Sequence, residues 1–227
     1  MEYAALRNDE HCPKGMYVLP SADSLLAWDA VLFVHQDCLL FQSAYFGTAN
    51  LSPVGYYTDA VLKFCVRFPP TYPSRAPEVT FATDVFHPLI SSDDGIMNVA
   101  PRFAPWRPKQ DHVFHLLHWI KAAFKKEILD NLKEVDCPNK EAFRYHDSTH
   151  SFAALATQSS MLSQSAPTLF ESAHYTSSSA VGTGIKGQQR QATQGIFFHE
   201  THESELDPLR SRLGLRPWTE RAKLVNS

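Results

Sequence analysis

The chain has 227 residues and a formal net charge of −3 at pH 7, so it can hold one ordinary domain with additional segments, and its charge does not favour nucleic-acid binding. No apolar run approaches the roughly 18 residues that span a bilayer, and the N-terminus lacks the layout of a signal peptide. The cysteines are far apart and no CxxC pair occurs among Cys12, Cys38, Cys65 and Cys137. We therefore expect a reduced cytoplasmic protein with no disulfide framework, no metal, no cofactor and no direct membrane insertion.

The first part of the chain predicts the end of a short helix followed by a meander of strands. The helix is expected at residues 2–8, and the strands at 15–20, 29–35, 60–68 and 78–82. The segment 60–68 is the clearest strand, because its apolar residues alternate with Lys63 and Arg67. This period of two is typical of a half-buried antiparallel strand.

Helices are expected after the strands. Apolar residues recur at steps of three and four within 111–129, which predicts an amphipathic helix; they are Val113, Leu117, Ile120, Phe124 and Ile128. Another helix is expected near 137–146. Strands followed by helices indicate an α+β domain, with helices grouped on one side of an antiparallel sheet, and we assign this core to residues 1–155.

The composition changes beyond the core. Residues 156–195 are rich in Ser, Thr, Gly and Gln, which predicts a flexible linker because few apolar side chains are available to offset the ordering entropy. Residues 196–218 are predicted to form a C-terminal docking segment, with a short helix that starts at Asp207–Pro208 and ends at Gly214. Its candidate partner-binding residues are Phe197, Phe198, Leu206, Leu209 and Leu213.

Residues 37–54 do not fit a compact sheet. They separate two predicted strands that would otherwise form a tight hairpin, and they are apolar rather than turn-like. The segment is either a real insertion or a translated intron, since its deletion leaves a compact turn between Gln36 and Gly55. Sequencing the transcript distinguishes the two, because a uniform mRNA that contains the segment rules out the intron.

The stretch from Phe86 to Trp106, "FHPLISSDDGIMNVAPRFAPW", together with the strand and proline-rich loop before it, resembles the core of the ubiquitin-conjugating family. The matching residues occur in the order of that family's pattern: Phe64, Phe68, Pro69, Tyr72, Pro73, Pro77, Val79, Phe81, Phe86, His87, Pro88, Gly95 and Trp106. The match covers roughly residues 15–150. The resemblance implies the ubiquitin-conjugating fold.

The chain departs from that pattern at the reacting residues. The resemblance implies a Cys three residues after Gly95 and an Asn directly after the His87–Pro88 pair, where this chain has Asn98 and Leu89. Ubiquitin transfer needs a thiolate that holds the thioester and a polar donor for the developing charge. An amide is not such a nucleophile and Leu89 donates nothing, so we expect a pseudo-enzyme.

Four blocks of the sequence resemble the fused-toes family more closely than the ubiquitin-conjugating family as a whole. The fused-toes family is a group of inactive ubiquitin-conjugating-like variants with Leu after His-Pro. The blocks are "GMYVLPSADSLLAWDAVLFVHQ", "DVFHPL", "MNVAPRFAPWRP" and "DHVFHLLHWIKAAF". This resemblance implies a Hook-type coiled-coil protein and the Fused-toes–Hook-interacting protein as partners, in a complex that links early endosomes or vesicles to dynein. The alternatives are a ubiquitin-binding variant that assists a true conjugating enzyme, and an active enzyme with a displaced cysteine, Cys65 or Cys137.

Three histidines in the predicted helix, His112, His115 and His118, raise the question of a metal site. At 100° per residue they centre almost opposite the face of Val113 and Ile120. We therefore interpret them as a polar helix face, with the C-terminal segment as its cover.

Overall fold

The computed structural model describes residues 2–8, 10–22, 24–35, 55–170, 196, 198–199, 201–212 and 214. It contains two compact units, Met1–Ile196 and Phe197–Ser227, each of which is described by itself. Residues 37–54 and the part of the expected linker after residue 170 lie outside the described residues.

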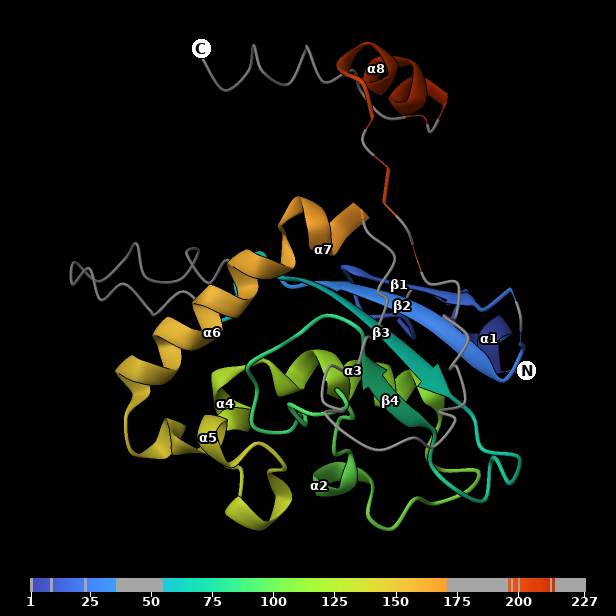
Figure 1. Ribbon diagram of the computed structural model, residues 1–227. Helices are drawn as coiled ribbons and strands as arrows, with labels where there is room; N and C mark the ends of the chain where they lie inside the picture. The colour runs from blue at the N-terminus through green and yellow to red at the C-terminus, as the bar shows by residue number, and fades with distance from the viewer. Residues whose placement is uncertain are drawn as a thin grey trace, which may run out of the picture. The chain divides into compact units, whose positions relative to one another are not determined.

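The first unit is built on a four-stranded antiparallel sheet in the order β1-β2-β3-β4 (Figure 1). A short helix, α1 (Glu2–Ala5), precedes the strands β1 (Met16–Pro20), β2 (Ala27–Phe33), β3 (Val61–Arg67) and β4 (Glu78–Phe81). Each strand pairs with its neighbour in sequence, as a meander does. The predicted α+β class with an antiparallel meander sheet is confirmed.

Strand β3 shows why the sheet has one core face. Leu62, Phe64 and Val66 are at most 2% exposed, whereas Lys63 is intermediate and Arg67 is exposed. Alternate side chains of a strand point to opposite faces, so the apolar set enters the core and the charged set leaves it. The alternation predicted for this segment is therefore confirmed.

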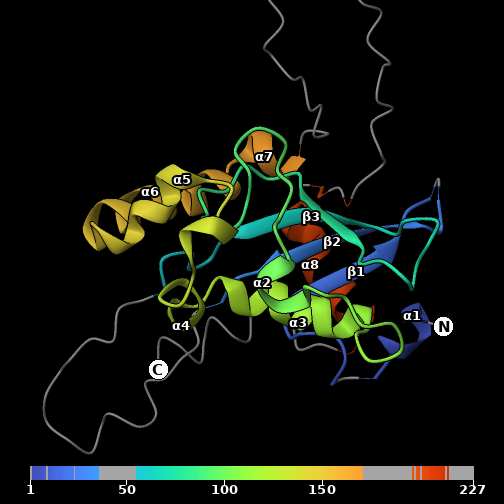
Figure 2. The same cartoon turned by 90° about the horizontal axis from the view of Figure 1, so that it is seen from below.

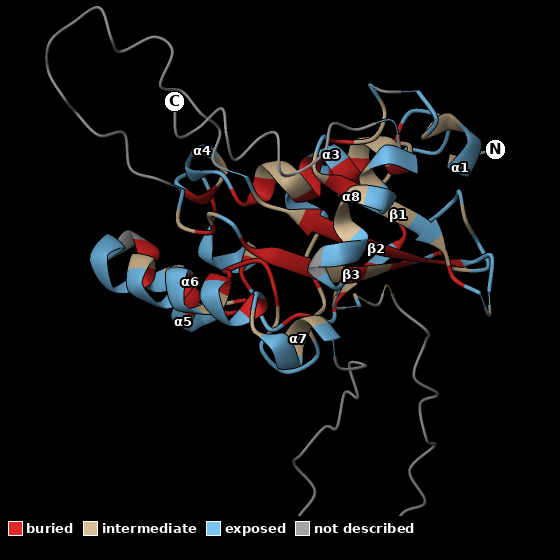
Figure 3. Ribbon diagram, turned by 90° about the horizontal axis from the view of Figure 1, so that it is seen from above, coloured by how far each residue is buried: buried red, intermediate tan, exposed pale blue. Residues whose placement is uncertain are grey.

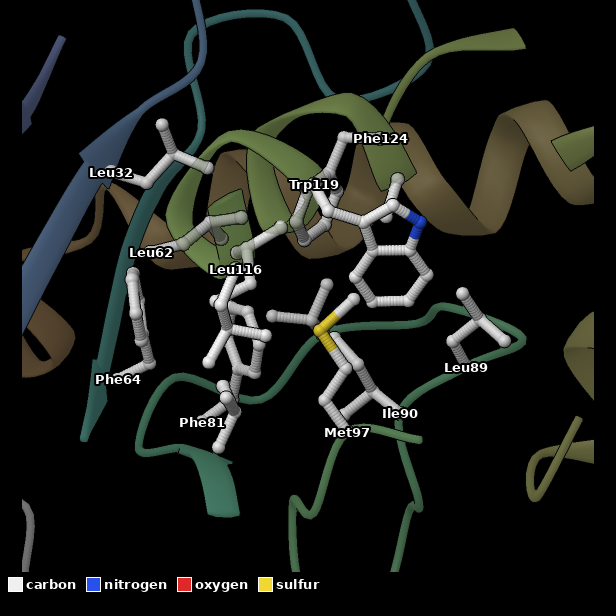
Figure 4. Packing of buried hydrophobic residues seen from close by; sticks show 14 of the residues in the cluster. Leu32, Leu62, Phe64, Phe81, Leu89, Ile90, Met97, Leu116, Trp119 and Phe124 are labelled. Atoms are coloured by element: carbon white, nitrogen blue, oxygen red, sulfur yellow. The ribbon is translucent and has the colours of Figure 1, made fainter. Parts of the chain in front are cut away.

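Helix α3 (Val113–Ala123) covers the inner face of the sheet, as the view from below shows (Figure 2). Its buried residues include the predicted apolar face: Val113, Leu116, Leu117, Trp119, Ile120 and Ala123. They pack with side chains of β2, β3 and β4 in one cluster (Figure 4). The single helix expected over 111–129 is wrong in one respect, because Lys125 is extended (φ −89, ψ 148) and a separate helix, α4 (Lys126–Leu129), follows it.

Four short helices lie in the connections, one before α3 and three after α4. They are α2 (Ala100–Phe103), η2 (Glu134–Asp136), α5 (Lys140–Phe143) and η3 (Arg144–His146). Asn139 begins α5, because its side chain accepts a hydrogen bond from the Ala142 amide at 2.9 Å.

The predicted start of the linker at residue 156 is wrong. Helix α6 (Thr149–Ser163) continues through this position, and α7 (Ala166–Phe170) follows. Apart from Phe152, the buried side of α6 consists of small residues, so the helix can lie close to the sheet despite its polar composition; they are Ala156, Ser160 and Ser163. The Ser163 hydroxyl accepts a hydrogen bond from the Val61 amide at 2.9 Å and so fastens α6 to β3.

The second unit contains helix α8 (Glu203–Arg212). The expected start at Asp207 is wrong, because the helix begins four residues earlier and holds Pro208 in its interior. Gly214 follows the helix with φ +69, in agreement with its predicted role at the end. Phe197 and Leu213 lie outside the described residues, Phe198 and Leu206 are half-buried, and Leu209 is exposed.

No helix among the described residues has the length and apolar character that crossing a membrane requires. Figure 3 shows that burial is concentrated in the sheet and α3, whereas α6 exposes most of its surface. The core of the first unit thus lies between the sheet and α3, and the turn that follows His87 packs against it.

Candidate functional site

The site begins with a buried histidine, His87, whose ring has no exposure. Its Nε2 donates to the Ala123 carbonyl at 3.0 Å, and its Nδ1 accepts from the Leu89 amide at 3.0 Å. These two bonds fix the neutral Nε2–H tautomer and join the turn to the end of α3. Burial lowers the pKa of His87 to about 4, although the hydrogen bond to Ala123 acts in the opposite direction.

Leu89 occupies the position after the His-Pro pair, and its side chain is fully buried. It belongs to the core cluster together with Ile90, Met97 and Trp119 (Figure 4). Its backbone carbonyl accepts a hydrogen bond from the backbone N–H of Asn98 at 2.8 Å, which holds residues 89 and 98 beside each other. The side chain at residue 89 therefore serves packing and offers no donor to a reacting group.

Gly95 positions the segment that carries Asn98. It has φ +70, and a Cβ atom built there would lie 2.4 Å from the Phe81 carbonyl oxygen. The close approach lets the Phe81 amide donate to the Gly95 carbonyl at 2.8 Å, so the segment runs along the edge of β4. Only glycine combines this backbone conformation with this contact.

Asn98 is half-buried, and both ends of its side-chain amide are engaged. Its Nδ2 donates to the Asp136 carbonyl at 2.7 Å, and its Oδ1 accepts from the Ala100 amide at 3.0 Å. The residue thus joins the start of α2 to η2. Sequence reasoning treated Asn98 as a lost nucleophile and missed this role, which depends on contacts between distant segments.

An open groove of about 560 Å³ lies beside Asn98. Its wall contains Val99 and Phe103 of the α2 region, Pro138 and the residues that lead into β4. The only charged residues among those that line it are Glu78 and Asp94. The groove offers surface for binding, and among the described residues that line it there is no thiol.

Trp106 is the last residue of the stretch Phe86–Trp106. Its indole nitrogen donates to the Pro73 carbonyl at 2.9 Å, and its ring lies 5.5 Å from the ring of Phe103. Phe103 is 4% exposed. These contacts pack both residues against the loop.

Cys137 directly follows Asp136, whose carbonyl accepts a hydrogen bond from the Asn98 side chain. It is 1% exposed, and its thiol contacts the Lys133 carbonyl at 3.3 Å. Burial, as the largest cause, raises the pKa of Cys137 to about 11. Cys12 and Cys65 are half-buried and burial also raises the pKa of each, while Cys38 lies outside the described residues.

We expect Cys137 to react with a water-soluble thiol reagent at least about tenfold more slowly in the folded chain than after unfolding, because the nucleophile is the thiolate. The measurement is the rate of labelling at pH 7.5, with the modified cysteine identified by mass spectrometry. Cys65 provides the internal comparison, because it is half-buried rather than buried. Rapid labelling of native Cys137 would contradict the inert thiol.

Two of the three histidines contact the N-terminal segment, namely His112 just before α3 and His118 within it. His112 Nδ1 lies 3.3 Å from a Glu2 carboxylate oxygen, and His118 Nε2 donates to the Glu10 carbonyl at 2.9 Å. His115 Nδ1 accepts from the His112 amide at 3.2 Å. The cover by the C-terminal segment stays a prediction, because that segment belongs to the second unit. No cluster of His, Cys, Asp and Glu suited to a metal occurs among the described residues.

The family model described as "Ubiquitin-conjugating enzyme" matches residues 1–122, which is more than half of the chain. The chain belongs to the ubiquitin-conjugating enzyme family. The match includes the sheet, the His87–Leu89 turn, Gly95, Asn98 and nearly all of α3. In this family member, His87, Leu89, Gly95 and Asn98 hold the turn and the groove in place through packing and hydrogen bonds to the backbone.

Two groups of curated relatives confirm the resemblance to the fused-toes group. The chain is 29% identical to "Protein crossbronx homolog" of Anopheles gambiae over 63% of its own length and 55% of that protein. It is 34% identical to "AKT-interacting protein" of Danio rerio over 49% of its own length and 32% of that protein. The chain thus spans about half or less of the curated relatives it matches.

A solved structure of the same family is also similar. It is the ubiquitin-conjugating domain of a Toxoplasma gondii enzyme, with 17% identity, a TM-score of 0.49, and coverage of 71% of this chain and 92% of that one.

Proposed function

We propose that this protein is a non-catalytic, ubiquitin-conjugating-like adaptor that works by binding other proteins. The observation that supports the absence of catalysis is Asn98, which stands three residues after Gly95 with its side-chain amide bound at both ends. Such an amide cannot carry a ubiquitin thioester. Leu89, buried in the core, adds no donor for an oxyanion.

The likeness to AKT-interacting protein and crossbronx supports the finer part of the proposal. The chain would act in a complex of the Fused-toes, Hook and Fused-toes–Hook-interacting protein type, at the cytoplasmic surface of early endosomes or vesicles, and link them to dynein. A Hook-type coiled-coil protein would be the direct partner. The C-terminal segment, with Phe198, Leu206 and Leu209, would contribute to the contact.

An active enzyme with a displaced cysteine is the second candidate. One observation favours it, because Cys137 follows the residue that Asn98 binds. Its burial and its raised pKa of about 11 oppose it, since the thiolate fraction at neutral pH is then very small. Cys65 lies on β3, whose segment pairs with β2 and β4 and does not enter the groove beside Asn98.

We expect no thiol-sensitive ubiquitin adduct when the purified chain is incubated with activating enzyme, ubiquitin and ATP. The measurement is a non-reducing gel, compared with a reduced sample and with an active conjugating enzyme as the positive control. Cys137→Ser is the matched variant. An adduct on the wild-type chain that disappears in Cys137→Ser would overturn the non-catalytic proposal.

The adaptor part is tested by affinity purification of the tagged chain from its own cells, followed by mass spectrometry. Recovery of a Hook-type coiled-coil protein with a dynein-linked companion is the expected result. Recovery of ubiquitin, conjugating enzymes or ligases without a coiled-coil protein would contradict it. That result would favour a ubiquitin-binding variant, which titration with labelled ubiquitin would then identify by specific chemical-shift changes.

A further inference from the structure

The arm formed by helices α6 and α7 has an unusual surface for an exposed element. Residues 148–170 contain no Asp, Glu, Lys or Arg, although most of α6 is exposed (Figure 3). Leu155 is 41% exposed and Leu162 is 58% exposed. An exposed helix without charge, and with large apolar side chains, is typical of a surface that another protein covers.

The two leucines form one ridge of the helix. Leu155 and Leu162 are seven residues apart, and Ser159 lies between them at the spacing that places all three on the same side. Residues on α6 at this spacing form a ridge that can fit into the groove of a second helix. The ridge borders the buried side of α6, so a helix placed along it would also contact the body of the unit.

The ridge leads into a second cavity of about 320 Å³. Ser159, Leu162 and Ser163 form its α6 wall, and the opposite wall includes residues 83–86, Asn139 and Glu141. Asn139 is 9% exposed, and its Oδ1 is used by the Ala142 amide. The Nδ2 group of its side chain has no hydrogen-bond partner among the described residues. It can therefore donate to an acceptor that enters the cavity.

The charges of this cavity have one sign. Asp84 and Glu141 are both exposed carboxylates, and neither makes a hydrogen bond or ion pair through its side chain with a described residue. No Lys or Arg occurs among the residues that line the cavity. An apolar ridge that ends in an acidic cavity is complementary to a segment with apolar side chains followed by a cation.

We propose that the ridge Leu155–Ser159–Leu162 and the adjoining acidic cavity bind an amphipathic helix of a partner protein, with leucine-type side chains on the ridge and a Lys or Arg in the cavity. The proposal rests on the adaptor function and gives that function a contact surface. The partner's apolar residues would cover Leu155 and Leu162, while its cation would meet Asp84 and Glu141. The uncharged surface of α6 would then avoid burying an unpaired charge at the contact.

The test begins with a photo-reactive amino acid at position 162 of the full-length chain in its own cells. Mass spectrometry of the cross-linked peptide is expected to identify a segment of another protein with apolar residues at helical spacing and a Lys or Arg within two turns of them. Position 161 provides the control, because Met161 is 69% exposed on the same helix but points about 100° away from Leu162. Cross-links only to residues 36–54 of the same chain, or only to a second copy, would overturn the proposal.

The affinity of the identified segment, made as a labelled synthetic peptide, is then measured against variants of the full chain. Leu162→Glu is expected to weaken binding at least about tenfold, and Met161→Glu to change it less than about twofold. The pair Asp84→Asn and Glu141→Gln is expected to weaken binding several-fold at low salt and to reduce its salt dependence. Equal effects of Leu162→Glu and Met161→Glu would contradict the ridge as the contact.

The two proposals fail in different ways. If the chain still captures the coiled-coil partner proposed above, and Leu162→Glu has no effect on the capture, the adaptor function stands and this surface is wrong. If the wild-type chain captures no such partner and forms a ubiquitin adduct instead, the adaptor function itself is wrong. The exposed position of Leu162 lets its variants fold, and an unchanged melting temperature checks this.

Discussion

Lowering the pH from 7 to 4 is expected to reduce the free energy of unfolding by about 3 kcal/mol through His87 alone. The ring is fully buried, and its pKa is lowered from 6.5 to about 4 in the folded chain. The unfolded chain therefore binds a proton on this residue at a pH where the folded chain does not. The contribution of the neutral His87 ring to the free energy of unfolding is fully present above pH 6.5 and is lost progressively as the pH falls toward 4.

The physical cause is visible in the two hydrogen bonds of the ring. A proton on Nδ1 would remove the bond from the Leu89 amide at 3.0 Å and would place a charge on a ring with no exposure, whose two partners among the described residues are backbone groups. The Nε2 bond to Ala123 is compatible with both protonation states, so it opposes the shift only in part.

Urea unfolding at several pH values between 4 and 7.5 measures this effect. The variant His87→Gln is expected to be less stable at pH 7 but to lose less stability on acidification than the wild-type chain. His150→Gln is the matched control, because His150 is exposed at the start of α6. Its replacement should leave the slope of the free energy of unfolding against pH unchanged. An identical slope in His87→Gln and the wild type would contradict the role of the buried ring.

The sheet and α3 were predictable because their patterns are local. The alternation along 60–68 and the steps of three and four along 113–124 depend only on which face of an element is buried. The break after α3 was not predictable in the same way. Phe124 and Ile128, on either side of Lys125, continue the apolar spacing of the helix, and the extended backbone at Lys125 depends on how the turn to α4 packs.

Helix α6 was missed for a different reason. Its buried residues are mostly Ala and Ser, which carry little hydrophobic signal, and Ser also favours caps and turns. Helix α6 and helix α7 after it are held by contacts to segments far away in the sequence. Ser163 accepts from Val61, and Lys63 donates to the carbonyls of Thr168 and Leu169 at 3.0 and 2.7 Å. Such pairings are not visible in composition.

The residues of the candidate site could be predicted from the sequence, but the hydrogen bonds between them could not. The positions of His87, Leu89, Gly95 and Asn98 follow from the family pattern, and the structure brings them together at one turn. The sequence could not indicate that Asn98 binds Asp136 or that two of the three histidines at α3 contact residues of the N-terminal segment. Those contacts depend on tertiary packing.

Replacing Leu89 with Asn, which is the residue that the family resemblance implies at this position, is expected to reduce the free energy of unfolding by about 4 kcal/mol. The leucine side chain is completely buried beside Ile90 and Met97. An amide there would lose the transfer energy of the leucine and would enter the core without a hydrogen-bond partner among the described residues. Urea unfolding at pH 7.5 gives the value directly.

Leu89→Met separates polarity from shape, because it keeps a similar volume and is expected to cost less than about 1.5 kcal/mol. A Leu89→Asn variant as stable as Leu89→Met would mean that the side chain can turn out of the core and reach the groove beside Asn98. The predicted loss means the opposite, since the turn that presents a donor in active relatives would here have become part of the hydrophobic core. Restoring one family residue would then damage the fold before it could restore chemistry, which is the behaviour expected of a domain maintained for binding.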